Sequence, residues 1–251
     1  MFFFKKKEIP INEFFPENFV DIHSHLLPGI DDGAKDLNNS IELILKMRSY
    51  GIKNFITTPH VLGSVYPNSS ETIKMKLKEV QEELKKRKIT DVSLGAAAEY
   101  MLDEEFSVLL EKDDILTLKD NLVLVEMSYF NAPNNLFEVL FELGLKGYKP
   151  ILAHPERYIF YHNNLRMYTK LKNAGCLFQL NLLSLTEKYG KNVQKTSLKL
   201  LEEGMYHYVG TDVHNIEHIR LLKDVSNKKT LHRIELLLEN NSKFYKKSAK
   251  N

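Results

Sequence analysis

The chain has 251 residues, of which 43% are hydrophobic and 27% are charged, and its formal net charge is +2 at pH 7. This composition predicts a soluble globular protein with a substantial core, and it lacks the strong basic charge expected of a nucleic-acid-binding protein. Cys176 is the only cysteine, so an intrachain disulfide and a cysteine-based zinc site are excluded.

The first predicted strand begins at Val20 and leads into a turn rich in proline and glycine. His23 and His25 lie between the strand and the turn. Side chains two residues apart on a strand point to the same side, so these two imidazoles can bind one metal ion. The turn can bring Asp31 or Asp32 to the same place. We expect Asp31 to serve the turn or to support a ligand, although the sequence does not separate the two aspartates.

Apolar strands and amphipathic helices alternate along the rest of the chain. After the opening strand, we predict strands at residues 53–60, 91–100, 122–126, 149–157, 177–181 and 207–214. We predict helices at residues 38–50, 67–88, 103–110, 136–145, 165–174, 192–203 and 230–238.

This alternation predicts an α/β fold with a parallel sheet covered by helices. We expect a distorted TIM-like barrel of about seven parallel strands, and an open doubly wound sheet is the alternative. The sequence has no repeat or linker, so we expect a single domain over residues 1–251. Within it, residues 1–20 form an N-terminal extension and residues from about 240 to 251 form a lysine-rich tail.

Six of the seven predicted strands end in a residue that can bind a metal ion. The carboxyl ends of parallel strands share one face of a barrel, and this face carries the active site. We therefore expect nine side chains to converge there: His23, His25, Asp32, His60, Glu99, Glu126, His154, Asp212 and His214. This mixture of histidines and carboxylates suits Zn, Mn or Fe, and its size suits two or three ions.

Each of these residues also has a simpler interpretation, because a single histidine at a strand end is usually a satisfied polar group. The remaining histidines lie in other settings. His162, His218 and His232 fall in predicted loops or helices and are expected at the surface, and His207 begins a strand.

The motifs at the strand ends resemble those of the polymerase and histidinol phosphatase (PHP) superfamily. Within it, they are similar to the CpsB/CapC (YwqE-like) family of bacterial protein-tyrosine phosphatases. The similarity runs from about Asp21 to about Leu222. The motifs that carry it are His23-Ser24-His25, Asp31-Asp32-Gly33, Thr57-Thr58-Pro59-His60, Ala98-Glu99, His154-Pro155-Glu156-Arg157-Tyr158 and Asp212-Val213-His214-Asn215.

The resemblance implies three metal ions, usually manganese, in a PHP-type barrel. It implies the following ligand sets: His23, His25, Glu99 and Asp212 for one ion; Glu99, Glu126 and His154 for a second; and Asp32, His60 and His214 for a third. It also implies that Arg157 contacts phosphate, and it assigns catalytic roles to Arg157, Asp212 and His214. A salt bridge to Glu156 or to a loop acid is the alternative for Arg157. Many relatives have an arginine after the last motif, for which Arg220 or His218 is only a doubtful substitute.

The predicted function is hydrolysis of phosphotyrosine in protein by attack of a metal-activated water. The chain has no Cys-x5-Arg loop, so a cysteinyl-phosphate route is excluded. One alternative is a small-molecule phosphatase of the histidinol-phosphatase type, and another is a non-catalytic regulatory module with the same fold. A nuclease is a further alternative, but the chain has no basic stripe to support it.

The family implies a partner, the phosphotyrosine-containing tail of a bacterial tyrosine kinase that controls capsule or exopolysaccharide synthesis. No apolar run reaches the roughly 20 residues of a transmembrane span. Residues 1–7 are too short for a signal peptide. We therefore expect a cytoplasmic protein that has no nucleic-acid partner. The inner face of the membrane is one place where we expect it to act.

Overall fold

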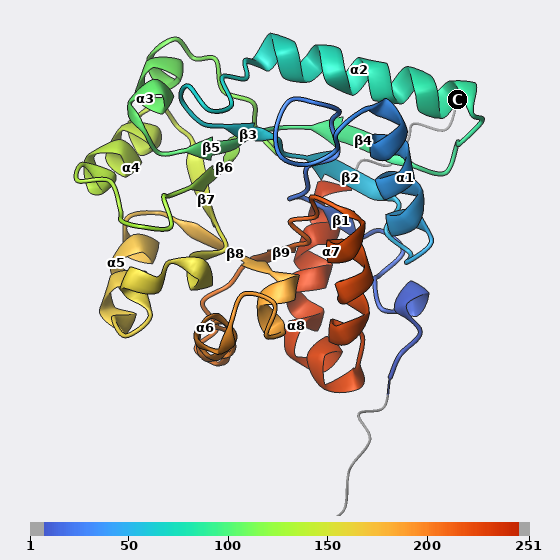
Figure 1. Cartoon of the computed structure of the whole chain (residues 1–251). Helices are drawn as coiled ribbons and strands as arrows, with labels where there is room; N and C mark the ends of the chain where they lie inside the picture. Colours follow the sequence, from blue (N-terminus) through green and yellow to red (C-terminus); the bar gives the residue numbers. More distant parts are fainter. Residues whose placement is uncertain (1–7, 246–251) are drawn as a thin grey trace, which may run out of the picture.

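The computed structural model describes residues 8–245, in which all the named strands pair in parallel. The strands form one sheet in the order β1-β2-β4 and another in the order β3-β5-β6-β7-β8-β9. Helices cover the outside of these strands (Figure 1). The strands are β1 Val20–Asp21, β2 Asn54–Thr57, β3 His60–Val61, β4 Ser93–Ala96, β5 Glu99–Met101, β6 Leu122–Glu126, β7 Lys149–Ala153, β8 Leu177–Asn181 and β9 Tyr208–Gly210.

The predicted helices are present, with bounds that shift by a few residues. The α-helices are α1 Leu37–Arg48, α2 Ser70–Lys86, α3 Glu104–Glu111, α4 Leu136–Leu145, α5 Leu165–Asn173, α6 Lys191–Glu202, α7 Ile216–Leu221 and α8 Lys228–Asn241. Helix α7 was not predicted, because six residues are too few to display a helical period. In the part of the chain that the structure describes, no helix is long and apolar enough to cross a membrane.

Two of the predicted strands, at residues 53–60 and 91–100, are each divided into two shorter strands. The segment predicted as 53–60 divides into β2 and β3 at Thr58 and Pro59, and Pro59 has no N–H to donate to a ladder. Hydrogen bonds continue across the break, since the backbone nitrogen of Glu99 donates to the oxygen of Pro59 at 3.0 Å. The break therefore keeps the register in which His60 pairs with Glu99.

The first and last strands meet at their carboxyl ends. The backbone nitrogen of His25 donates to the oxygen of Val213 at 2.9 Å, and that of Asp212 donates to the oxygen of His23 at 2.7 Å. At the other end, the side chain of Asn241 bridges the two strands, donating to the oxygens of Val20 and Val209 at 2.8 Å each. The strands thus close into a distorted barrel, and the open-sheet alternative is wrong.

Residues that precede β1 and residues that follow α8 pack against the barrel. Phe14, Phe15 and Phe19 are buried in the predicted N-terminal extension, and Phe244 is buried near the C-terminus. Within residues 240–245, Asn241 and Phe244 therefore pack against the barrel. Residues 1–7 and 246–251, where the rest of the extension and tail was predicted, lie outside the described residues.

The single thiol lies away from solvent. Cys176 is buried just before β8, and burial raises the pKa of its thiol to about 12. At neutral pH the thiol is therefore protonated and a poor nucleophile. This agrees with the exclusion of a cysteine-based mechanism.

Candidate metal centre

The carboxyl ends of the strands carry a compact group of histidines and carboxylates. The structure brings together all nine predicted ligand residues, since each belongs to a group whose nitrogen and oxygen atoms lie within 4.8 Å of one another. They come from segments spread between residues 23 and 214. Convergence at this face is what parallel strands in a barrel require.

Glu99 lies at the centre of the group. Its Oε2 is 3.1 Å from Nε2 of His23 and 3.4 Å from Nε2 of His25, and its Oε1 is 3.1 Å from Nε2 of His154. Oδ1 of Asp212 lies 3.3 Å from His23 Nε2 and 3.4 Å from His25 Nε2. The two oxygens of Glu99 thus face different histidines, which is the geometry of a bridging carboxylate.

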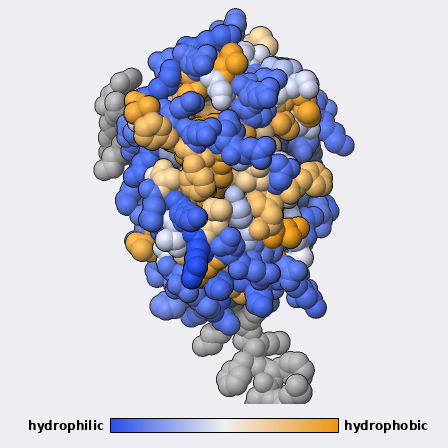
Figure 2. Space-filling model, turned by 90° about the vertical axis from the view of Figure 1, so that its left-hand side faces the viewer, coloured by the Kyte–Doolittle hydropathy of each residue, from blue (hydrophilic) through white to orange (hydrophobic). Residues whose placement is uncertain are grey.

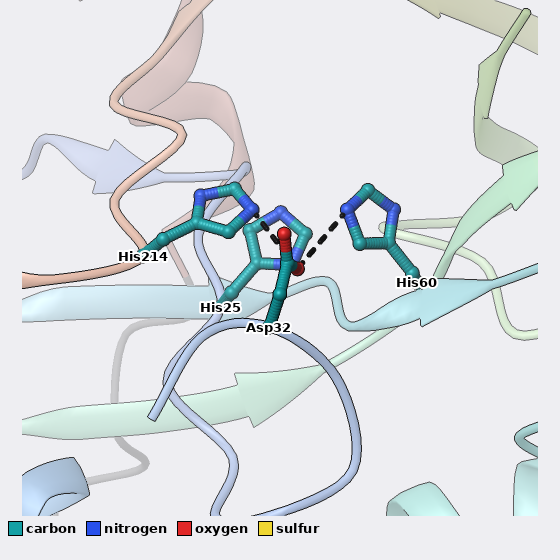
Figure 3. A group of neighbouring side chains, drawn as sticks. All are labelled: His25, Asp32, His60 and His214. Atoms are coloured by element: carbon teal, nitrogen blue, oxygen red, sulfur yellow. Dashed lines mark ion pairs between the residues drawn. The ribbon is translucent and has the colours of Figure 1, made fainter. Parts of the chain in front are cut away.

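A second cluster, drawn in Figure 3, comprises His25, Asp32, His60 and His214, and all but His25 are exposed or half-buried. Oδ1 of Asp32 is 3.4 Å from Nε2 of His214 and 3.5 Å from Nε2 of His60, and His25 lies behind them. The other nitrogen of His60, Nδ1, is 2.9 Å from Oε1 of Glu126. His60 therefore connects the outer cluster to Glu126.

Hydrogen bonds on the far side of the rings orient two of the histidines. Nδ1 of His23 lies 2.8 Å from Oε1 of Gln179, and Nδ1 of His25 lies 2.8 Å from Oδ2 of Asp31. These acceptors favour the tautomer with the proton on Nδ1, which leaves the lone pair of Nε2 directed at the carboxylates. Gln179 was not predicted as a partner of His23, because it lies 156 positions away along the chain.

The structure separates the two aspartates of the turn. Asp31 accepts hydrogen bonds from the backbone nitrogens of Gly33 and His60 as well as from His25, so it supports the turn and the ring. Asp32 points into the outer cluster instead. The turn folds tightly onto the strand, because a Cβ on Gly33 would lie 2.4 Å from the Cβ of His25. Only glycine fits there.

The electrostatics of the inner group favour bound positive charge. Burial by itself would raise the pKa values of Glu99 and Asp212. His23 and the neighbouring histidines instead hold both pKa values well below their usual range. Burial alone would lower the pKa of His23, yet Glu99 and Asp212 raise it to about 9. Without another cation, a proton on His23 therefore balances the carboxylates, and a metal ion in the same place would displace it.

Several buried atoms of the group have no hydrogen-bond partner. They are Nε2 of His23 and His25, Nδ1 of His60 and His154, and Oε2 of Glu99. Orphaned buried polar atoms are costly, and four of these five atoms face neighbouring site residues at distances that suit a shared cation. The donor set therefore fits metal ions. Burial also lowers the pKa of His154 to about 4, which keeps this ring neutral.

Two site residues have strained backbones. His154 has φ 34° and Asp212 has φ 50°, in the left-handed region that residues with a Cβ rarely adopt. Such conformations persist only where the surrounding structure holds them, and they are common at functional sites. Here His154 faces Glu99, and Oδ1 of Asp212 faces His23 and His25.

Arg157 follows β7 in a short 3-10 helix and reaches the edge of the group. Its Nη1 donates to Oδ2 of Asp212 at 2.8 Å. The guanidinium lies between two aromatic rings, with its carbon 4.5 Å from the centre of Tyr129 and 4.2 Å from that of Tyr189. Glu156 is not its partner, because that carboxylate is buried and accepts hydrogen bonds elsewhere. Of the two partners considered for the alternative salt bridge, the structure has an acid that follows a strand, Asp212.

A cleft of about 550 Å³ opens over the group. Its floor includes Asp32, Arg157 and Asp212, and apolar and aromatic side chains line its walls, among them Tyr66, Met101, Leu102, Tyr129, Phe130 and Pro133. The cleft thus joins a charged floor to walls that suit a flat apolar group.

One of three residues near the last motif, His218, differs from expectation. His218 is half-buried against the site, with Nδ1 3.3 Å from the backbone oxygen of Asp212, so its expected surface position is wrong. Arg220 is exposed and pairs with Glu217 at 3.5 Å. Asn215 caps α7. Neither Arg220 nor His218 lines the cleft.

The chain is similar in sequence to proteins of a known family. The family described as "Capsular polysaccharide synthesis, CpsB/CapC" matches residues 19–230. Tyrosine-protein phosphatase YwqE of Bacillus subtilis is 34% identical over 202 residues, covering 79% of this chain and 78% of YwqE. Tyrosine-protein phosphatase CpsB of Streptococcus pneumoniae is 29% identical over 205 residues, covering 79% of this chain and 84% of CpsB.

Solved structures are similar as well. A crystal structure from work on YwqE and CpsB, described as metal-dependent tyrosine phosphatases, has a TM-score of 0.75 and 30% identity. It covers 88% of this chain and 94% of its own. A zinc-containing amidohydrolase from Burkholderia ambifaria has a TM-score of 0.54 and 10% identity, covering 94% of this chain and 87% of its own. The second similarity extends to the fold alone.

Proposed function

Because this chain belongs to the CpsB/CapC family, we propose that it is a metal-dependent phosphatase that hydrolyses phosphotyrosine in protein. The observation that carries the proposal is the convergence of nine histidines and carboxylates on one barrel face, beside a guanidinium in the same cleft. This arrangement suits phosphoryl transfer, in which positioning and charge stabilisation do most of the catalysis.

We propose that the site holds two or three divalent ions, with manganese the first choice and iron or zinc the others. His23, His25, Glu99 and Asp212 would hold one ion, and Glu99 would share a second with Glu126 and His154. Asp32, His60 and His214 would hold a third. The orphaned nitrogens and the two-sided contacts of Glu99 support this assignment.

Ions bound by these residues would supply the positive charge that lowers the pKa of a bound water molecule and offsets the charge of the phosphate. Arg157 binds a phosphate oxygen, and the rings of Tyr129 and Tyr189 keep its guanidinium in place. Asp212 and His214 act at the same edge of the cleft, where His214 Nδ1 lies 3.0 Å from the backbone oxygen of Asp212.

The cleft walls support an aromatic phosphoester. Tyr66 stacks on His60 with ring centres 5.7 Å apart, and Tyr129 and Phe130 line the same cleft. These aromatic side chains suit contact with the phenyl ring of a phosphotyrosine. This favours phosphotyrosine over the small-molecule alternative.

An exposed apolar surface supports a polypeptide substrate. Phe130 lines the cleft and is 91% exposed. Phe137, Phe141 and Leu145 follow on the outer side of α4, and we call these three residues the α4 apolar face. Figure 2, which looks onto the side of the molecule that carries α4, displays apolar side chains gathered across the middle of that side. Residues flanking a phosphotyrosine would contact this surface.

We propose that the partner is the tyrosine-containing tail of a bacterial kinase that controls capsule synthesis, reached at the inner face of the membrane. A mixture of reconstituted kinase and this protein tests the pairing, with loss of kinase phosphotyrosine as the expected result. Persistence of that phosphotyrosine, while a free phosphotyrosyl peptide is hydrolysed, would contradict the partner but not the activity.

The activity is tested on manganese-loaded protein with a phosphotyrosyl peptide and with histidinol phosphate. We expect the peptide to be hydrolysed at least tenfold more efficiently. His23→Ala should abolish hydrolysis, and the exposed His232 supplies a matched control, His232→Ala. Preference for histidinol phosphate would favour the small-molecule alternative, and inactivity of metal-loaded protein on both substrates would favour a regulatory module.

A further inference from the structure

One strand end in the barrel carries a side chain that the proposed metal site does not use. β8 ends in Asn181, whose neutral amide is a poor ligand for manganese, iron or zinc compared with histidine or carboxylate. Asn181 is fully buried. Its side chain nevertheless points into the group, because Nδ2 donates to Oδ2 of Asp212 at 2.8 Å.

The two oxygens of Asp212 have different environments. Oδ1 faces Nε2 of His23 and of His25, where the proposed ion would lie. Oδ2 accepts hydrogen bonds from Asn181 and from Arg157, each at 2.8 Å. The two donors therefore fix which oxygen faces the ion, and this matters because the backbone of Asp212 is itself strained.

The two donors are not equivalent. Arg157 is 19% exposed and lines the cleft, so a bound phosphate would share its guanidinium. Asn181 has no contact with solvent and remains on Oδ2 whether or not substrate is present. It is thus the permanent support of the carboxylate.

Asn181 is itself held on two sides. Its Oδ1 accepts a hydrogen bond from the backbone nitrogen of Leu183 at 2.9 Å, which fixes the amide with Nδ2 toward Asp212. Its backbone nitrogen donates to Oε1 of Glu156 at 3.0 Å, and Oε2 of Glu156 accepts from the hydroxyl of Tyr206 at 2.9 Å. Glu156 of the His-Pro-Glu-Arg motif therefore supports β8 and not the phosphate.

We propose that Asn181 is a positioning residue that holds Asp212 with Oδ1 toward the metal ion. The inference rests on the proposed metal site. Groups that orient a metal ligand commonly contribute about 10–100-fold to metal affinity. Asn181 has no contact with the cleft, so its loss should lower metal affinity and kcat and leave KM for the phosphotyrosyl peptide within about twofold.

The test uses the full chain with Asn181→Ser and Asn181→Leu. Serine is a good acceptor for the Leu183 nitrogen but is too short to reach Asp212, so Asn181→Ser should fold. The matched control is Asn241→Ala, since Asn241 is an equally buried asparagine that bonds only backbone groups of the barrel seam. The measurements are manganese binding by calorimetry on metal-free protein, the melting temperature, kcat and KM.

We expect Asn181→Ser to bind at least one manganese ion about tenfold or more weakly, with kcat lowered. Asn241→Ala should melt at a lower temperature and bind manganese as the unaltered protein does. Unaltered manganese affinity and kcat in folded Asn181→Ser and Asn181→Leu would overturn the inference while leaving the proposed function in place. If the unaltered protein bound no manganese, iron or zinc, the proposed site would fail and the inference with it.

Discussion

Replacing Arg157 with alanine separates a substrate-binding arginine from a purely structural one. The residue contributes a charged donor beside the candidate ions and a cation between two aromatic rings. Loss of one preorganised donor to the transition state commonly lowers turnover by about 10²–10³-fold. We therefore expect kcat on a phosphotyrosyl peptide to fall by about a hundredfold or more.

The structure also changes the expected effect on stability. The sequence predicts that a phosphate-binding arginine can be removed with little thermal effect. Two cation–π contacts, each of roughly 0.5–2 kcal/mol, indicate a loss of about 2 kcal/mol. For a chain of this length, that corresponds to a melting temperature lower by about 4–8 °C. Asp212 keeps Asn181, His23 and His25 as neighbours, so its charge is not left unpaired.

Two further variants, Arg157→Lys and Arg220→Ala, are compared with Arg157→Ala. Arg157→Lys keeps the charge but not the planar fork, so it should restore only part of the rate. Arg220→Ala is the matched control, because Arg220 is exposed and pairs only with Glu217, and its turnover should stay within about twofold of normal. The assay is kcat, metal content and melting temperature on all three variants. Near-normal turnover of folded, fully metallated Arg157→Ala would remove this residue from the active site.

Three further predictions follow from the site and the cleft. Gently purified protein, or protein reloaded with manganese, should contain more than one transition-metal ion per chain by elemental analysis, and one or none would contradict the ligand assignment. EDTA should abolish hydrolysis, whereas Cys176→Ser should leave it intact because the thiol pKa of about 12 keeps the sulfur protonated; full activity in EDTA would refute a metal mechanism. Phe141→Ser should raise KM for a phosphotyrosyl protein severalfold without changing KM for free phosphotyrosine, and Leu236→Ser is its control, since Phe141 is 65% and Leu236 67% exposed. Equal effects of these two variants would exclude the α4 apolar face from substrate binding.

Local sequence patterns were sufficient for the architecture. Apolar runs followed by amphipathic helices predicted the parallel barrel, which the structure and the similarity to YwqE and CpsB confirm. The positions of the candidate ligands were also accessible, because the direction of a parallel strand decides which of its ends meets the others. His23, Glu99 and His154 could therefore be placed on one face without knowledge of any contact between them.

Other features depend on contacts between distant parts of the chain. Asp31 and Asp32 are adjacent and chemically identical. Only the packing of Gly33 against His25 decides that Asp31 contacts the ring of His25 and that Asp32 faces His214. The break at Pro59 was hidden because the chain is extended on both sides of it.

The supporting groups were the least predictable. Gln179 and Asn181 reach His23 and Asp212 from positions 156 and 31 residues away, and Asn241 closes the seam 221 residues from Val20. A hydrogen bond between two side chains leaves no period in the sequence, whereas burial of a strand or helix face does. The sequence by itself therefore determined the elements, their direction and the chemistry at their ends. The tertiary structure decided which oxygen and which nitrogen of each side chain faces the site, because that depends on partners that only folding brings within 3 Å.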